Sequence, residues 1–284
     1  MEEKEHWDLT IEPSGSIFKL NLKDVWRYRD LLLMFVKRDY VSFYKQTILG
    51  PLWFFIQPAL TTLVYSIIFG GLAQISTDGL PRFLFYLSGI TAWNYFADCI
   101  IKTSTVFKDN ANIFGKVYFP RLIMPLSIVL SNLVKFFVQI ILLLIAIVYY
   151  KYFTEGVDIQ FTSALLIFPL LVLIMAILGL GIGLIISSLT TKYRDLSFLV
   201  TFGVQLLMYA TTVIYPLSFA SEKFRPYIEM NPMTSVIEAF RYSLLGRGEF
   251  QFSYLMNSFF TSIVILVLGV IVFNKTEKDF VDTI

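Results

Sequence analysis

Two ionisable side chains, Asp98 and Lys135, lie within long apolar stretches of the sequence. Burying either charge alone in a bilayer costs at least roughly 2.5–3.5 kcal/mol, so such residues normally face a protein interior or a partner of opposite charge. Asn94, Asp98 and Lys102 recur every four residues and therefore share one face of a helix. We expect Asp98 and Lys135 to face the interior of a helix bundle and to form an intramembrane ion pair. The pair would be a structural clamp or a proton relay, and the absence of a chain of further carboxylates favours the clamp.

Sequence motifs for catalysis are absent. There is no G-x-x-x-x-G-K-[ST] loop for a nucleotide, no H-E-x-x-H and no G-x-S-x-G elbow. Cys99 is the only cysteine and His6 the only histidine, so neither an internal disulfide nor a His/Cys metal site can form. We therefore expect no catalytic residue, metal or cofactor in this chain, which is not an enzyme by itself, and no nucleic-acid partner. If ATP powers it, a separate subunit must hold the ATP and Mg.

Polar-tipped side chains deep in the first and fifth apolar stretches form a second group of interest. Tyr, Trp and Gln side chains seek a wet or hydrogen-bonding surface for their polar atoms. Aromatic rings also stack on the C–H faces of sugars while sugar hydroxyls reach the polar tips, so a path lined in this way would suit a glycan. The residues predicted to line a channel are Trp53, Gln57, Tyr65, Gln205, Tyr209 and Tyr215.

Six apolar stretches must position these residues. Each has roughly the 20 residues that a helix needs to cross the hydrocarbon core. The chain is 56% hydrophobic and only 15% charged, with a mean hydropathy of +0.69. Because backbone polar groups cannot stay unpaired in lipid, we predict an all-α membrane protein with six transmembrane helices. The predicted spans are 49–73, 83–101, 122–150, 162–189, 196–217 and 252–273.

The distribution of Lys and Arg among the loops predicts the orientation. Eight of them precede the first span, and four, two and two lie in 102–121, in 190–195 and after residue 273. Only six lie in the alternate loops. Since positive charge accumulates on the cytoplasmic side, both termini are predicted to be cytoplasmic.

Two segments outside the spans are predicted to be helical as well. Residues 1–23 are expected to be a cytoplasmic leader. In 24–45, apolar residues recur at the spacing of an amphipathic helix in the membrane interface. That helix would be a surface anchor for the first span or an elbow that receives force from a cytoplasmic partner. Residues 218–251 hold two short apolar segments around Asn231-Pro232, which predict a re-entrant external hairpin or an external cap packed on the bundle.

Smaller patterns concern the helix contacts and the cytoplasmic loops. Gly179 and Gly183 lie four residues apart and predict close helix packing, since a dinucleotide site would need a preceding strand and another glycine spacing. In the loop between the second and third spans, Asp109 and Asn110 could cap a short helix. This loop and the turn at 190–195 could also be no more than solvated connections.

Several runs of sequence, taken in order, resemble the ABC-2 permeases of bacterial polysaccharide exporters, which carry O-antigen, capsule or teichoic-acid chains. The resemblance extends from about Asp24 to the C-terminus, over all six spans. The runs are YKQTILGPLWFFIQP (44–58), NIFGKVYFPRLIMPLS (112–127), KYRD (192–195), NPM (231–233) and EKDFVDTI (277–284).

The resemblance implies a homodimer in the bacterial cytoplasmic (inner) membrane, bound to two copies of an ABC nucleotide-binding subunit. It implies a lipid-linked polysaccharide as substrate, in contact with membrane lipid, and a channel surrounded by the first and fifth spans of both protomers. The residues implied to couple to the ATPase are Asp109, Asn110, Asn112, Ile113, Phe114, Lys116, Tyr193, Arg194 and Asp195. The hairpin implied near the external gate, 218–247, contains Asn231, Pro232, Glu238 and Arg241.

The leading interpretation is the transmembrane subunit of an ATP-driven exporter of a lipid-linked, O-antigen-like polysaccharide. An ABC-2 permease for a drug or lipid is the alternative, and it would have a lateral cavity rather than an aromatic-lined tunnel. An ion-coupled secondary transporter would be expected to show internal repeats and more intramembrane charge. A membrane-embedded polyprenyl or glycosyl transferase would need acidic metal ligands, and the cytoplasmic loops between the spans hold only Asp109 and Asp195.

Overall fold

The computed structural model describes residues 22–45, 47–114, 116, 119–154, 159–193 and 195–281. Within these ranges every regular element is a helix, which confirms the all-α prediction. Most of the leader expected at 1–23 lies outside the described residues, as does Arg194.

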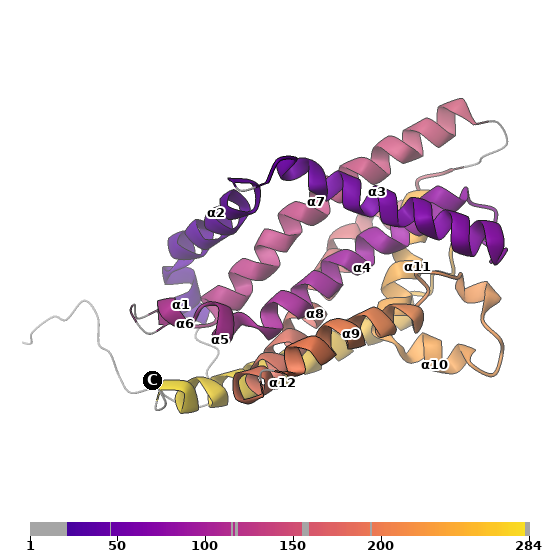
Figure 1. Cartoon of the computed structure of the whole chain (residues 1–284). Coiled ribbons are helices and arrows are strands. Elements are labelled where there is room, and N and C mark those ends of the chain that lie inside the picture. Colours follow the sequence, from indigo (N-terminus) through magenta and orange to yellow (C-terminus); the bar gives the residue numbers. More distant parts are fainter. Residues whose placement is uncertain are drawn as a thin grey trace, which may run out of the picture.

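The helices follow one another along the chain, with the following bounds. The elements are α1 (Leu22–Arg27), α2 (Arg29–Lys45), η1 (Gly50–Leu52), α3 (Trp53–Tyr65), η2 (Ser66–Leu72), α4 (Arg82–Ser104), α5 (Val106–Asp109), α6 (Ala111–Phe114), α7 (Ile123–Phe153), η3 (Ser163–Ile167), α8 (Phe168–Lys192), α9 (Leu196–Tyr209), η4 (Leu217–Phe219), α10 (Arg225–Met230), α11 (Pro232–Leu245) and α12 (Phe252–Val281). Figure 1 shows the long helices running beside one another, with α1, α2, α5 and α6 at one end and the α10–α11 hairpin at the other.

Four helical segments are long and apolar enough to cross a membrane, and they correspond to predicted spans one, three, four and six. They are Gly50–Leu72, Ile123–Phe153, Ser163–Lys192 and Phe252–Thr276. The second predicted span is α4, whose 23 residues include Arg82, Asp98 and Lys102 and are therefore less apolar. The fifth is α9, an apolar helix of 14 residues. The total of six spans stays a prediction.

The helix of the fifth predicted span, α9, is shorter than its apolar stretch predicts. It ends at Tyr209 rather than at Leu217. The residues that follow form turns instead of a further helical turn. The carbonyl groups of Thr212 and Val213 accept hydrogen bonds from the guanidinium of Arg241 in α11. A tertiary donor thus satisfies backbone groups that a continued helix would have paired internally.

The centre of the bundle is α4, which packs on α7, α8 and α11. Glycines allow the closest of these contacts. A Cβ atom added at Gly179 would lie 2.8 Å from Cys99 Cβ, and one at Gly183 would lie 2.6 Å from Thr103 Cβ. Neither distance is compatible with a side chain at the glycine, so the prediction of close packing at these residues is confirmed.

The N-terminal amphipathic segment forms two helices, α1 and α2, which meet at Tyr28. The ring of Phe35 is buried and packs 5.7 Å from that of Phe119, which attaches α2 to the segment before α7. Trp26 and Met34 remain exposed on the outside of the protein. An apolar face turned away from the bundle is what an interfacial helix presents to lipid.

The segment around Asn231-Pro232 is helical on both sides, as two short apolar segments would require. Asn231 Oδ1 accepts a hydrogen bond of 3.0 Å from the backbone N–H of Met233 and so caps α11. The helix ends at Gly246, whose φ of 69° is the left-handed conformation that favours glycine. Most of α11 is buried against α4, α8 and α12, whereas α10 has no buried residue.

Candidate translocation surface

Three of the residues predicted to line a channel come together where α3 and α9 end. The side chains of Tyr65 and Tyr209 lie close enough to interact, and Tyr215 Oη donates to the carbonyl of Tyr209 at 3.3 Å. The ring of Tyr65 also packs edge-on against Phe69 and Tyr86, at centroid distances of 5.2 and 6.3 Å. We name Tyr65, Tyr209 and Tyr215 the tyrosine cluster.

The other three predicted lining residues lie elsewhere on the same helices. Trp53 and Gln57 lie in the first half of α3, Gln205 lies in the second half of α9, and all three are exposed. Among the described residues, no hydrogen bond joins their side chains to the tyrosine cluster. They are accessible on the surface of this chain, and their role in lining a channel stays a prediction.

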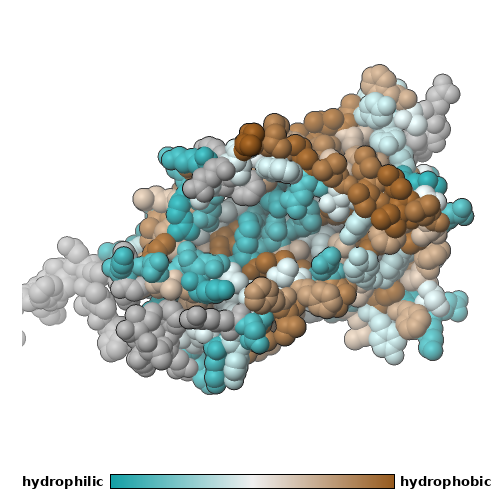
Figure 2. Space-filling view, viewed as in Figure 1, coloured by the Kyte–Doolittle hydropathy of each residue, from teal (hydrophilic) through white to brown (hydrophobic). Residues whose placement is uncertain are grey.

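The surfaces of α3 and α9 around these residues are apolar. The exposed side chains include Leu60, Leu63 and Val64 of α3, Ile67 of η2, and Phe198, Leu199, Phe202 and Leu206 of α9. Figure 2 shows these helices as two hydrophobic regions with a recessed hydrophilic surface between them. Such a surface has apolar sides and a polar floor.

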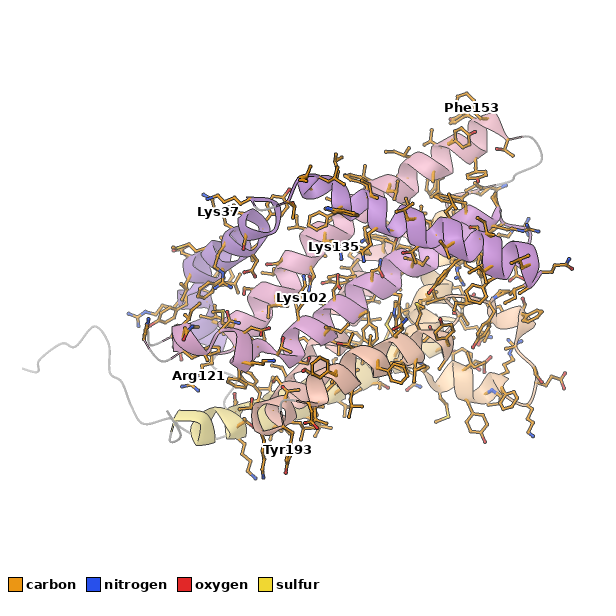
Figure 3. All side chains as sticks on the ribbon, viewed as in Figure 1. Lys37, Lys102, Arg121, Lys135, Phe153 and Tyr193 are labelled. Atoms are coloured by element: carbon orange, nitrogen blue, oxygen red, sulfur yellow. The ribbon has the colours of Figure 1, made fainter. Side chains whose placement is uncertain are left out.

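The polar floor is built on α4 and α7. Lys135 Nζ lies 2.7 Å from Asp98 Oδ2, so the structure brings together the two residues expected to pair. Lys102 Nζ, one helical turn from Asp98 along α4, donates to Asn132 Oδ1 at 2.7 Å. We name Asp98, Lys102, Asn132 and Lys135 the lysine recess. Figure 3 labels Lys102 and Lys135, which lie between α4 and α7 on the face in view.

Packing explains why α4 presents a polar stripe here. Between Leu84 and Ser104, every residue is buried except Asn94, Asp98, Ile101 and Lys102. The four-residue spacing noted in the sequence therefore marks the only accessible strip of the second half of this helix. The side chains of Asp98 and Lys135 retain 26% and 17% of their exposure. Asn132 was not singled out in the sequence, although it lies one turn before Lys135 on α7.

The residues expected to couple to an ATPase divide into exposed and buried ones. Asp109, Asn112 and Lys116 are exposed around α5 and α6, where a partner could contact them. Thr105 Oγ1 donates to Asp109 Oδ2 at 2.6 Å, which helps to hold the start of α5. Asn110 directly precedes α6 and donates from its side chain to the carbonyl of Val106 at 3.0 Å. This hydrogen bond ties the side chain of Asn110 back to α5.

Phe114 and Ile113 have a different place from the exposed coupling residues. The ring of Phe114 is buried 5.7 Å from the rings of Phe107 and Phe119, so it anchors α6 to the bundle. Ile113 is partly buried against the same core. Tyr193 is exposed at the end of α8, and Asp195 is exposed just before α9.

Glu238 and Arg241, expected near an external gate, are buried inside α11. Arg241 Nη1 lies 3.4 Å from Glu238 Oε1, and its guanidinium lies 3.7 Å from the centre of the Phe85 ring. Glu238 Oε2 in turn accepts from the backbone N–H of Glu249 at 3.1 Å. Arg241 thus connects the segment after α9 to the first half of α4, and Glu238 connects the loop before α12 to α11.

A second ion cluster lies nearby on the exposed part of the hairpin. Arg225 Nε lies 2.8 Å from Glu229 Oε1, and the same guanidinium also contacts Glu249. The hydrogen bond with Glu229 raises the pKa of Arg225 above its ordinary value. The α10 helix is thereby tied to the loop before α12.

Comparisons with known proteins match nearly the whole chain. The family model described as "ABC-2 type transporter" matches residues 30–245. An O-antigen export system permease protein RfbA of Klebsiella pneumoniae is 30% identical over 253 residues, covering 89% of this chain and 94% of that protein. Its counterpart in Myxococcus xanthus is 27% identical over 265 residues, with 93% and 98% covered. The polysialic acid transport protein KpsM of Escherichia coli is 23% identical over 204 residues, with 69% and 74% covered.

Proposed function

The chain belongs to the ABC-2 type transporter family, and from this premise we propose that it is the transmembrane subunit of an ATP-driven exporter of a lipid-linked, O-antigen-like polysaccharide. The observation that carries the proposal is the similarity to O-antigen export permeases over 94% or more of their length. The protein would lie in the bacterial cytoplasmic membrane with both termini in the cytoplasm. It would perform no chemistry itself.

The translocation path would form between two copies of the chain. Charged side chains of the polar floor would be unfavourable in free energy if they faced lipid. A second protomer that covers the floor would keep these charges away from lipid. The apolar sides formed by α3 and α9 would then meet their counterparts around it. Trp53, Gln57 and Gln205 would line the path, and the tyrosine cluster would offer rings and hydroxyls to the passing sugars.

Two copies of a nucleotide-binding subunit, which hold ATP and Mg, would dock at the end of the bundle that carries α5 and α6. Asp109, Asn112 and Lys116 are accessible there, and Tyr193, Arg194 and Asp195 would complete the contact. Only Thr105 separates α4 from α5, so a displacement of α5 is transmitted directly to α4 and its polar stripe. ATP binding that draws the two ATPases together would thus rearrange α3, α4 and α9 around the path.

The hairpin of α10 and α11 would be re-entrant, at the external mouth of the path. Asn231 and Pro232 set its turn, and the Glu238–Arg241 pair fixes α11 to the end of α9. Because the tyrosine cluster lies directly before this connection, the hairpin would set the width of the external exit. Movement during export would then be confined to the opposite, cytoplasmic ends of the helices.

Co-purification with the ATPase encoded beside the gene tests this proposal. Residues 109–117 are replaced by Gly/Ser, and the exposed external residues 221–223 are replaced in the same way as a matched control. We expect a stable complex from the wild type and the control, and a lost or uncoupled complex from the 109–117 variant. If no ATPase binds the wild-type chain, the exporter proposal fails.

A further inference from the structure

The lysine recess carries one positive charge that its own residues do not compensate. Lys135 is neutralised by Asp98 at 2.7 Å. Lys102, by contrast, has a neutral amide as its partner, and within the part of the chain that the structure describes no carboxylate forms an ion pair with it. Two ammonium groups and one carboxylate leave the recess with a net charge of +1. Lys102 is exposed, so its uncompensated ammonium group is accessible to an anionic ligand.

The charged pair of α2 that contacts α7, Arg38 and Asp39, does not change this balance. Arg38 Nη2 lies 2.7 Å from Asp39 Oδ1, so the two neutralise each other. Asp39 Oδ2 also accepts a hydrogen bond of 3.3 Å from Ser131, the residue before Asn132. The carboxylate that comes nearest from α2 is thus already occupied by a guanidinium and a hydroxyl.

The hydrogen bond between Asp39 and Ser131 also indicates the depth of the lysine recess in the membrane. The exposed apolar residues of α2 mark it as an interfacial helix, and its Asp39 reaches Ser131 at the level of the recess. Lys102 lies in the last turn of α4, whereas Asp98 and Lys135 lie about one turn deeper. Lys102 would therefore lie at the level of the lipid phosphates, and the ion pair just beneath them.

We propose that the lysine recess binds the phosphate group of the lipid that carries the substrate. Lys102 would donate hydrogen bonds to the phosphate oxygens in place of its hydrogen bond to Asn132. Asp98, which is paired with Lys135, would weaken the attraction between Lys135 and the phosphate. The lipid tail would lie along the apolar side formed by α3, and the glycan would extend over the polar stripe of α4. The inference rests on the proposed function. A phosphate is the anion present on every lipid carrier that could reach this depth from the membrane side.

Two substitutions should change the affinity in opposite directions. Lys102→Gln lowers the recess charge to zero, and we expect roughly five- to tenfold weaker binding. Asp98→Asn raises the charge to +2 by freeing Lys135, and we expect binding to strengthen by a similar factor. Lys151→Gln, at the far end of α7, removes an equal charge elsewhere and should leave the affinity unchanged. A gain of affinity in Asp98→Asn cannot arise from misfolding.

The experiment uses the complete permease–ATPase complex in nanodiscs of neutral phosphatidylcholine. Binding of a fluorescent polyprenyl diphosphate is titrated, with assembly of each complex checked by size-exclusion chromatography. Competition by phosphatidylglycerol separates the two sources of phosphate: weak competition assigns the site to the carrier, and equal competition assigns it to membrane phospholipid headgroups. Unchanged affinity in both Lys102→Gln and Asp98→Asn would overturn the phosphate site. The proposed function fails separately, if no ATPase complex assembles at all.

Discussion

Replacing Arg241 by methionine tests how the end of α9 at Tyr209 is held. The Arg241 side chain is 1% exposed, and it donates to the carbonyls of Thr212 and Val213, the latter at 2.9 Å. It also lies against Glu238 and over the Phe85 ring. Methionine keeps much of the apolar volume but offers no donor and no charge. The variant therefore isolates the polar role of this residue.

The expected cost follows from the groups left behind. Removing one partner of a buried ion pair typically costs about 3–5 kcal/mol, because the other charge stays buried without compensation. The carbonyls of Thr212 and Val213 also lose their donor, but these terms overlap and do not add. We expect Arg241→Met to lower the free energy of unfolding by about 3–5 kcal/mol. Glu238→Gln in the same chain removes the orphaned carboxylate and should recover about 1–2 kcal/mol of that loss.

Denaturant unfolding of the detergent-purified protein, followed by tryptophan fluorescence, measures both variants. Arg247→Met is the matched control, because Arg247 is exposed just beyond α11 and its loss should change stability by no more than about 0.5 kcal/mol. If Arg241→Met stays within about 1 kcal/mol of the wild type, the buried guanidinium does not hold this region together. A double variant less stable than Arg241→Met alone would show that the Glu238 carboxylate is not left without compensation.

Three further substitutions follow from the contacts in the bundle. Gly183→Ala places a methyl group 2.6 Å from an α4 side chain and should lower the thermal midpoint, at a cost of about 1–3 kcal/mol. Gly203→Ala is the control, because its methyl group meets nothing within 4 Å and should be neutral or stabilising. Equal thermal midpoints for the two variants would contradict close packing at Gly183. Lys135→Met leaves Asp98 unpaired and should reduce the yield of folded protein, and adding Asp98→Asn should restore it, which expression and gel filtration would check. Tyr209→Ala should slow export in a cell-surface glycan assay without loss of assembly, and unchanged export would exclude the tyrosine cluster from the path.

Hydropathy and spacing were sufficient for the parts of the molecule governed by local rules. Lipid forces apolar stretches to be helical, so the helices could be located from composition alone. The charges of Asp98 and Lys135 needed a partner, and each was the other's best candidate. Glycine spacing predicted that α8 packs closely on another helix, because only small residues permit such an approach, but it did not identify α4 as that helix.

Features that depend on contacts between distant segments could not be predicted. The end of α9 at Tyr209 depends on a guanidinium from α11, and nothing in the apolar stretch 196–217 signals that donor. The burial of the Phe114 ring was not predicted, because it packs into an aromatic cluster whose members are brought together only by the fold. Lys102 was noticed for its spacing, yet its uncompensated charge became evident only from its neutral partner on α7.

ATP-dependent transport in reconstituted vesicles tests whether this chain is the transmembrane subunit of a polysaccharide exporter. This chain and its ATPase are incorporated into proteoliposomes with the ATPase facing outward, and a lipid-linked polysaccharide is added to the outer leaflet. We expect the glycan to become protected inside the vesicles only when ATP and both proteins are present. Protection without ATP or without this chain, or uptake of lipid with no requirement for the glycan, would show that the chain is not the permease of such an exporter.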